Sequence, residues 1–361
     1  MNSRSIFLKS FRVLLLPFAV LYGLIVKFRN KCFDKKWFAS SHFNFPIICV
    51  GNLAVGGTGK SPMVEYLINL LEPDFKIATL SRGYKRKTKG YALANEYTTA
   101  VEIGDEPMQF YLKHPNISVA VGEERIVAIP YLLQDCPDLQ AIILDDAYQH
   151  RTVNAGFNIL LSDYRNLYVH DFFLPTGDLR DEKVSANKAD VIVVTKCPAD
   201  LSLNKKETVL TELKALPHQK VFFTTIKYGI PYHIYDHAVT HKITQEDEVL
   251  LVCGIANPKP LKDFLLKNTQ TYYQLDFSDH HIFTIDDLKE IVQYFETIQE
   301  PNKIILTTEK DAVRLIKFKD ELANIPLFVI PISPLFLFNE GPQFDKMLVN
   351  FVRNFTFNPE S

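Results

Sequence analysis

The sequence predicts an α/β protein in which short buried strands alternate with helices around a mostly parallel sheet. Three observations predict this fold class. A glycine-rich loop at 54–61, AVGGTGKS, lies between an apolar strand-like run and a helical pattern. A second apolar run at 141–144 is followed directly by two aspartates. Two later segments, 248–266 and 302–316, each have the pattern of a strand, a turn and a helix, and 361 residues are enough for two domains.

Composition and charge narrow the class of protein. Hydrophobic residues make up 47% of the chain and charged residues 23%, as in an ordinary folded globular protein. The five cysteines are far apart and form no CxxC pair, so we expect buried thiols in a reducing cytosol and neither disulfides nor a zinc site. Residues 1–36 carry a net charge of +7 within a total of −2. This asymmetry argues against a nucleic-acid-binding protein and favours an N-terminus that meets an anionic surface.

The N-terminal segment contains an uncharged apolar run, VLLLPFAVLYGLIV at 13–26. Fourteen residues are too few to cross a bilayer comfortably, because a spanning helix needs about 20. Basic residues continue after the run and no small-residue cleavage site follows it, which argues against a signal peptide. Pro17 and Gly23 would weaken a buried core helix. We therefore expect a membrane-associated helix in the cytoplasmic leaflet, with a core helix and a true span or signal as the alternatives.

The glycine-rich loop predicts a nucleotide site. It follows the buried run FPIICV (45–50) and precedes SPMVEYLINLL (61–71), whose apolar residues have helical spacing, so it occupies the strand–loop–helix context of a phosphate-binding loop (P-loop). Backbone N–H groups would surround the phosphates, Lys60 would reach the β- and γ-phosphates, and the Ser61 hydroxyl would bind Mg²⁺. The alternative is a tight turn without a ligand. The predicted cofactor-binding residues are Ala54, Val55, Gly56, Gly57, Thr58, Gly59, Lys60 and Ser61.

A second metal-binding element is predicted at AIILDDAYQHR (141–151). Asp145 and Asp146 stand at the end of the apolar run, where an acid leaving a buried strand can contact a nucleotide-bound Mg²⁺. Either aspartate could contact the metal directly or through water. The segment VIVVTKCPAD (191–200) approaches a guanine-reading motif, but Pro198 stands where that motif needs aspartate. We interpret it as the end of a strand, which disfavours a GTPase.

Further basic and acid–base residues could serve phosphoryl transfer. LSRGYKRKTKG (80–90) is a dense basic cluster, for which a solvated loop is the alternative interpretation. Arg82, Arg125 and Arg180 could clamp phosphates or stabilise transition-state charge, because a guanidinium matches phosphate oxygens. A histidine of DFSDHHIF, either His280 or His281, is predicted to act as a general base or to tune one, in preference to binding metal.

Taken together, these stretches resemble the tetraacyldisaccharide 4'-kinase family. The matching segments occur in family order from residue 51 to about 315: GNLAVGGTGKSP, LSRGYKRKTKG, GDEP, VGEER, LDDAYQHR, LPTGDLR, VTKCP, CGIANP, DFSDHH and LTTEKDAVR. The chain departs from the family where Ala147 and Tyr148 replace Gly-Phe, where Lys85 replaces a glycine, and where Ser61 replaces threonine. The resemblance implies a P-loop NTPase core, a smaller α/β domain joined by an extended two-stranded link, and attachment to the cytoplasmic face of the inner membrane.

The expected organisation follows from this resemblance and from the composition of the chain. Residues 1–36 would form the membrane-associated helix and its basic flanks, and 37–220 the kinase core. Residues 221–335 would form the smaller domain with its hinge, and 336–361 a segment returning to the core.

The resemblance also implies a reaction. ATP with Mg²⁺ would phosphorylate the 4'-hydroxyl of an acylated glucosamine disaccharide 1-phosphate, a lipid of the membrane surface, in lipid A biosynthesis. Asp105 would take the hydroxyl proton. His280, which with Asp279 matches the family's Asp-His motif, would orient Asp105 or raise its basicity. Arg82, Arg125 and Arg180 would serve the substrate 1-phosphate or the transferring group. The alternatives are a membrane-attached P-loop ATPase that phosphorylates no lipid, and a soluble kinase of a small molecule.

Overall fold

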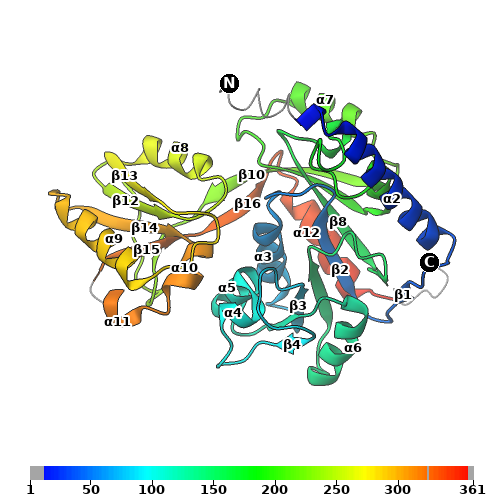
Figure 1. The fold of residues 1–361 in the computed structure, drawn as a ribbon, viewed down its shortest axis with the longest axis horizontal. Helices are drawn as coiled ribbons and strands as arrows, with labels where there is room; N and C mark the ends of the chain where they lie inside the picture. The colour runs from blue at the N-terminus through cyan, green and yellow to red at the C-terminus, as the bar shows by residue number, and fades with distance from the viewer. Residues whose placement is uncertain (1–11, 323–324, 357–361) are drawn as a thin grey trace.

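The computed structural model describes residues 12–322 and 325–356. Two α/β domains lie side by side, joined by a pair of strands (Figure 1). The larger domain contains a nine-stranded sheet and the smaller a five-stranded sheet. This arrangement confirms the predicted fold class.

The large sheet is parallel except at its two edges. Its strands are β2 (Ile47–Asn52), β3 (Ile77–Ser81), β4 (Ala92–Leu93), β5 (Ser118–Val121), β6 (Ala141–Asp145), β8 (Phe157–Asp163), β9 (Val191–Thr195), β10 (Lys220–Tyr228) and β16 (Ile332–Phe336). The order is β16-β10-β9-β8-β2-β6-β3-β5-β4, with β16 and β4 antiparallel to their neighbours. The central strands are buried and mostly apolar because helices cover both faces of the sheet.

Two hydrophobic layers sandwich this sheet. The surrounding elements are α3 (Lys60–Leu71), α4 (Ala100–Ile103), α5 (Asp105–Lys113), α6 (Arg125–Asp135), α7 (Leu203–Leu213), α12 (Gly341–Arg353), the 3-10 helices η1 (Tyr168–His170) and η2 (Lys183–Lys188), and a small parallel pair, β1 (Ser41–His42) with β7 (Val153–Asn154). Alternate residues of β2 enter different layers, because successive side chains of a strand point to opposite faces. Helices α6 and α7 cover one face, and α3, α5 and α12 cover the other.

The smaller domain has its own core. Its elements are β11 (Tyr232–His233), β12 (Glu248–Cys253), α8 (Lys259–Asn268), β13 (Thr271–Asp276), α9 (Ile285–Thr297), β14 (Lys303–Thr308), α10 (Glu309–Leu315), α11 (Lys319–Leu322) and β15 (Leu327–Ile330). The sheet order is β11-β15-β14-β12-β13, and only β11 is antiparallel to its neighbour. Helix α8 packs on one face, and α9, α10 and α11 pack on the other. The two segments predicted as strand, turn and helix form β12–α8 and β14–α10.

The link between the domains is the antiparallel pair β10 and β16. Thr224 to Tyr228 of β10 pair with Phe336 to Ile332 of β16 at the edge of the large sheet. The chain enters the smaller domain after β10 and returns from β15 into β16 with one residue between them. The sequence resemblance implied such a two-stranded link, and the structure contains it.

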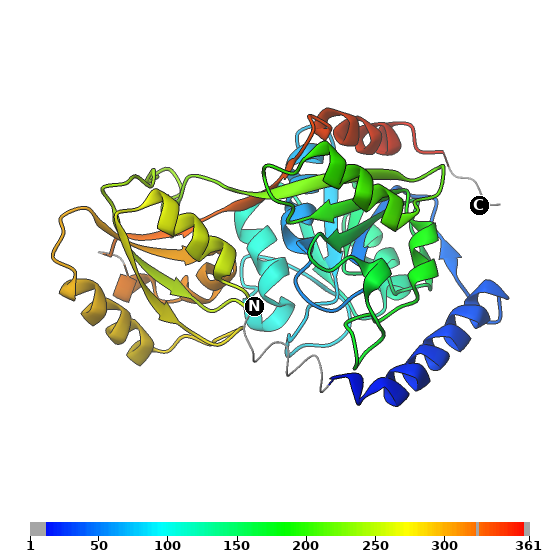
Figure 2. The ribbon, with the colours of Figure 1, turned by 90° about the horizontal axis from the view of Figure 1, so that it is seen from above.

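The N-terminal helix, α2 (Leu16–Asp34), lies along the outside of the large domain (Figure 2). Pro17 falls in its first turn, where proline is tolerated. Gly23 faces the ring of Phe173, and a Cβ there would lie 2.7 Å from that ring. Thus both residues that argued against a buried helix fit this helix: Pro17 because it lies in the first turn, and Gly23 because it packs closely on Phe173. Of the helices in the described part of the chain, none combines the length and the apolar content needed to cross a membrane.

Candidate active site

The glycine-rich loop forms an open backbone cradle between β2 and α3. Gly56 has φ +104° and Gly59 has φ +88°, conformations that L side chains rarely adopt. A Cβ built on Gly56 or Gly57 would meet nothing within 4 Å. The outer side of the loop therefore has room for a ligand against its backbone, as a phosphate site requires.

The first two residues of the loop are engaged by a distant segment. Ala54 bridges Leu179 in antiparallel fashion, and the Val55 N–H donates to the carbonyl oxygen of Asp178 at 2.7 Å. Phosphate-binding loops of this type commonly begin with glycine, where this chain has Ala54. Ala54 is buried and is not among the residues with positive φ, so the backbone at this position does not require glycine. In this structure the Val55 N–H is already used within the protein.

The end of β9, in the segment that resembles a guanine-reading motif, holds the glycine-rich loop through Thr195 and Lys196. The Thr195 hydroxyl donates to the Thr58 carbonyl at 2.8 Å. The Lys196 ammonium contacts the Gly57 carbonyl and pairs with Asp163 at 2.8 Å. Strand β9 ends at Thr195, as interpreted from the sequence, and the lysine after it fixes the phosphate loop.

Lys60 lies in a polar cluster at the carboxyl ends of β2 and β6. Its ammonium is 3.4 Å from Asn52 Oδ1 and 3.7 Å from Asp146 Oδ1. Arg180 binds the same two partners, donating to Asn52 at 2.6 Å and to Asp146 at 2.5 and 3.3 Å. Burial alone would raise the pKa of Asp146, but Lys60 and Arg180 outweigh it and lower that pKa. The structure thus brings together three residues predicted separately, and it adds Asn52.

Asp145 differs from its neighbour in having a free oxygen. The carboxylate is buried, and its Oδ1 has no hydrogen-bond partner among the described residues. Burial, with the adjacent Asp146 charge, raises the pKa of Asp145 to about 7. A buried carboxylate oxygen without a partner beside a phosphate-type loop fits a hard cation such as Mg²⁺. In the described part of the chain, no three His, Cys, Asp or Glu side chains are grouped to hold a metal alone, and Mg²⁺ on a nucleotide needs only one or two carboxylates.

The charges of the three predicted arginines all act on His150. Burial, followed by the charges of Arg125 and Arg82, lowers the pKa of His150 to about 4, and Arg180 acts in the same direction. Arg125 is fully buried and donates to the Gly122 and Glu123 carbonyls, while its Nε and Nη2 have no partner among the described residues. Arg82, in contrast, is exposed. This concentration of positive charge suits an anionic ligand.

Asp105 is held by side chains from the smaller domain. His280 Nδ1 lies 2.9 Å from Asp105 Oδ2, and Arg314 donates from Nε to Oδ1 at 3.1 Å and from Nη2 to Oδ2. Lys310 Nζ lies 3.2 Å from His280 Nε2. Arg314 Nη2 also lies 2.8 Å from His280 Nδ1, so this ring nitrogen is placed between the Asp105 carboxylate and the Arg314 guanidinium.

The electrostatics of this group are set across the domain boundary. Burial would raise the pKa of Asp105, but hydrogen bonds and charges from Arg314 and His280 lower it. His280 itself has φ +64°, a left-handed conformation that is strained for a residue with a side chain and typical of functional positions. Lys310 also pairs with Glu106 at 3.3 Å.

Sequence reasoning missed Arg314, Lys310, Asn52 and His150 as site residues. Arg314 and Lys310 lie in LTTEKDAVR, a segment recognised only as part of the resemblance. Charged residues at the start of a helix are common, so nothing in that segment alone indicated a partner more than two hundred residues away. Asn52 and His150 lie within the recognised segments GNLAVGGTGKSP and LDDAYQHR, and their positions became informative only once the sheet order placed β2 beside β6.

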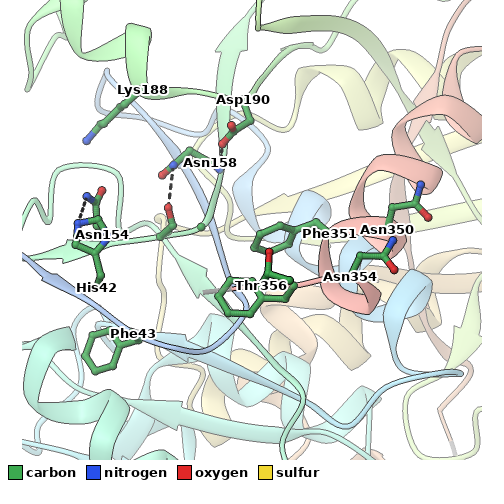
Figure 3. Close-up of a pocket in the computed structure, with 13 residues that line it drawn as sticks. His42, Phe43, Asn154, Asn158, Lys188, Asp190, Asn350, Phe351, Asn354 and Thr356 are labelled. Atoms are coloured by element: carbon green, nitrogen blue, oxygen red, sulfur yellow. Dashed lines mark hydrogen bonds between the residues drawn. The ribbon is translucent and has the colours of Figure 1, made fainter. Parts of the chain in front are cut away.

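A separate pocket of about 410 Å³ lies near the amino end of β8, away from the carboxyl ends of the strands (Figure 3). It is lined by residues from the start of β8, from β7 and from α12, among them Asn158, Asn154 and Phe351. Ligands of parallel α/β sheets bind at the carboxyl ends of strands. Lys188 and Asp190 are already used, donating to the Tyr148 carbonyl and accepting from the Asn158 N–H. This pocket is therefore not a candidate active site.

Comparison with known proteins identifies the family. The family described as tetraacyldisaccharide-1-P 4'-kinase matches residues 11–353. The chain belongs to this family. A tetraacyldisaccharide 4'-kinase of Flavobacterium johnsoniae is 44% identical over 342 residues, covering 95% of this chain and 97% of the relative. One from Bacteroides fragilis strain YCH46 is 41% identical over 353 residues, covering 95% and 94%.

A solved structure shares the fold of this family member. It is the LpxK of Aquifex aeolicus, an "apo" form in complex with ATP, 28% identical in sequence with a TM-score of 0.73. The match covers 95% of this chain and 99% of that one. The similarity therefore includes both domains and the link between them.

Proposed function

We propose that this protein transfers the γ-phosphoryl group of ATP to the 4'-hydroxyl of a tetraacylated glucosamine disaccharide 1-phosphate, a step of lipid A biosynthesis. One observation carries the proposal. Gly104, which caps α5 just before Asp105, packs against the segment that follows β3, since a Cβ built on it would lie 3.1 Å from the Tyr84 carbonyl oxygen. Strand β3 pairs with β6, and β6 ends beside Asp146, which lies 3.7 Å from Lys60. The nucleotide half and the acid–base half of a phosphoryl-transfer site therefore lie at the carboxyl ends of neighbouring strands.

The nucleotide would bind against the open backbone of Gly56 to Gly59, with Lys60 on its terminal phosphates. Ser61 and Asp145 would hold Mg²⁺, because Asp146 is already paired with Arg180 and Lys60 whereas Asp145 has a free oxygen. When bound, the ion neutralises negative charge on the β- and γ-phosphates. Lys60 adds a fixed positive charge at the same position.

Asp105 would accept the proton of the acceptor hydroxyl. The O–H bond of the 4'-hydroxyl breaks, its oxygen bonds to the γ-phosphorus, and the bond from that phosphorus to ADP breaks. Because Arg314 and His280 lower the pKa of Asp105, its carboxylate is a weak base and takes the proton late, as the phosphoryl group arrives. His280 holds the carboxylate through Nδ1, and Lys310 fixes the orientation of the imidazole ring.

Arg82, Arg125 and Arg180 would serve the anionic groups of the reaction. Their charges converge on His150, which burial and these cations keep neutral at pH 7. A neutral histidine among three guanidiniums leaves a strongly positive position, and the two unpartnered donors of Arg125 are available there. We assign this region to the substrate 1-phosphate or to the transferring phosphoryl group.

Helix α2 would attach the enzyme to the cytoplasmic face of the inner membrane. Large apolar side chains project from it into solvent, among them Phe18, Leu21 and Ile25, each more than half exposed. The same helix contacts the active-site segment, because Tyr22 donates to the Arg180 carbonyl at 3.2 Å. The acyl chains of the substrate would stay in the leaflet, since burial is worth about 0.8 kcal/mol per CH₂. The enzyme could then reach the hydroxyl without extracting the lipid.

Transfer of ³²P from [γ-³²P]ATP to the disaccharide lipid in mixed micelles tests the proposal. Lys60→Ala and Asp105→Asn should each lower labelling by about 10²- to 10³-fold, typical of losing a transition-state charge or a general base. Lys289→Met, at an exposed surface pair, is the control and should label at the wild-type rate. ATP hydrolysis that needs no lipid and leaves no label would overturn the proposal in favour of a P-loop ATPase.

A further inference from the structure

The two domains meet where α5 and α10 lie side by side (Figure 1). Asp105, the first residue of α5, pairs with Arg314 near the end of α10. Lys113, the last residue of α5, pairs with Glu309, the first residue of α10. The helices therefore run antiparallel, with an ion pair between the domains at each end. We call this contact, defined by the two ion pairs, the α5–α10 seam.

The Lys113 end of the seam holds no reacting group. The Lys113 ammonium also contacts Glu65 of α3, so it joins a carboxylate from the large domain to one from the smaller domain. Glu65 is 5% exposed and Glu309 is 6% exposed. Carboxylates are seldom buried this deeply unless a cation neutralises them. Lys113 supplies that cation to both.

Hydrogen bonds from uncharged donors connect this cluster to the points where the chain enters and leaves the smaller domain. Tyr232 donates to Glu309 Oε1 at 3.4 Å, and the Ile332 N–H donates to Glu309 Oε2 at 3.3 Å. Tyr232 is the first residue of β11 and Ile332 the first of β16, where the chain enters and leaves the smaller domain. On the other side, Gln109 donates to Glu65 at 3.2 Å. A change in this cluster would therefore affect the contacts at Tyr232 and Ile332, where the chain enters and leaves the smaller domain.

The charge balance of the cluster depends on one side chain. Burial would lower the pKa of Lys113, but Glu309 and Glu65 outweigh it and raise that pKa, so the ammonium stays charged. Burial and the Glu65 charge raise the pKa of Glu309 to about 7. Without Lys113, two buried carboxylates would face each other across the domain boundary, an arrangement that favours separation.

We propose that Lys113 is a positioning residue for the phosphoryl transfer. By joining Glu65 to Glu309, it holds the smaller domain at the spacing at which Arg314 reaches Asp105. Helix α3 begins at the phosphate-binding lysine, α5 begins at the proposed base, and α10 carries the arginine, so one ammonium fixes all three helices. The inference rests on the proposed function, because it gives this contact its purpose.

Three variants test the inference in the full chain. Lys113→Met removes the charge and keeps much of the side-chain length. Lys113→Glu/Glu65→Lys exchanges the partners, which still leaves one ammonium between two carboxylates and keeps Glu309 as the acceptor of the Tyr232 and Ile332 hydrogen bonds. Lys259→Met, at an exposed ion pair with Asp263 in the smaller domain, is the matched control. Each variant is assayed for kcat and KM with the disaccharide lipid and for hydrogen–deuterium exchange of α10 without substrates.

We expect Lys113→Met to lower kcat by about tenfold to a hundredfold, as small misplacements of reacting groups do. Exchange of α10 amides should accelerate, because the contact that protects this helix is lost. The exchanged pair should restore kcat to within about threefold of wild type, since positioning depends on the contact and not on which side carries the charge. The Lys259→Met control should change neither readout.

The inference would be overturned if Lys113→Met had the kcat and the hydrogen–deuterium exchange of the wild type. It would also be overturned if the charge-exchanged variant had a kcat no higher than that of Lys113→Met. If circular dichroism finds Lys113→Met unfolded, the charge-exchanged variant decides alone. Wild-type protein that labels no lipid overturns the proposed function, and the positioning role falls with it. Hydrogen–deuterium exchange of α10 distinguishes failure of the positioning role from failure of the proposed function, because it reports on the α5–α10 seam without any turnover.

Discussion

Asp105 receives its hydrogen bonds from residues that the chain places 175 and more positions away. Arg314 binds both of its oxygens, and His280 binds one of them. A carboxylate held in this way is ionised over the whole physiological range and keeps one geometry. The base of the proposed reaction is therefore assembled only when the smaller domain is in place.

Replacing Arg314 should change the pH profile of the reaction. Arg314 lowers the pKa of Asp105, so its loss in Arg314→Met should raise that pKa. Asp105 then becomes protonated at a higher pH, and activity is lost earlier as pH falls. The acid limb of kcat/KM against pH measures the shift. Arg314→Lys, which keeps the charge, should shift the limb less, and an unmoved limb in Arg314→Met would contradict this role.

Individual residues also explain a departure from the family pattern. Lys85, for which the resemblance implied a glycine, adopts φ +61°, the left-handed conformation for which glycine is preferred. The backbone at this position is therefore one that a glycine would adopt without strain.

At the scale of elements, α2 and the segment 171–182 form one unit with the phosphate-binding loop. Gly23 packs on Phe173, and Asn30 donates to Asp181 at 2.7 Å. The same segment pairs with the loop through Leu179 and carries Arg180. The N-terminal helix thus contacts the segment that carries Arg180, and Arg180 binds Asn52 and Asp146, the two partners of Lys60.

Enlarging Gly23 should disturb this unit. In Gly23→Leu the new side chain would overlap the Phe173 ring, so α2 must shift away from the segment, at a cost of about 1–3 kcal/mol typical of overpacking. Hydrogen–deuterium exchange of α2 should accelerate, and lipid phosphorylation should fall more than ATP binding. Val20→Leu, on the exposed face of the same helix, is the control. Unchanged exchange in Gly23→Leu would show that the close contact is not needed.

At the scale of the whole molecule, the exposed apolar face of α2 should determine membrane binding. Replacing Phe18, Leu21 and Ile25 with serine removes side chains worth about 1.5–3 kcal/mol each when fully buried. Cosedimentation with anionic phospholipid vesicles should fall by at least tenfold, while kcat on substrate in detergent micelles is retained. Leu266→Ser, an exposed apolar residue of the smaller domain, should leave vesicle binding unchanged. Equal vesicle binding by the triple variant would contradict a membrane role for α2.

The sequence was sufficient for the features whose signal is local. The phosphate loop, the aspartates after β6 and the strand–helix repeats of the smaller domain are all contiguous patterns, and each lies where predicted. The parts it could not supply are contacts between distant segments. Some of these contacts depend on how the two domains pack, which no short segment of sequence indicates. They include the contacts of Arg314 and Lys310 with Asp105 and His280, and the Lys113 bridge. Asn52 became a site residue only through the pairing of β2 with β6.

The position of the new phosphate tests the central claim most directly. The purified protein is incubated with ATP and the tetraacylated disaccharide 1-phosphate, and the recovered lipid is examined by ³¹P–¹H correlation NMR. We predict a second phosphate on the 4'-oxygen, absent from the product of Lys60→Ala. A phosphate at another position, or ADP release with the lipid unchanged, would contradict the proposed 4'-kinase activity.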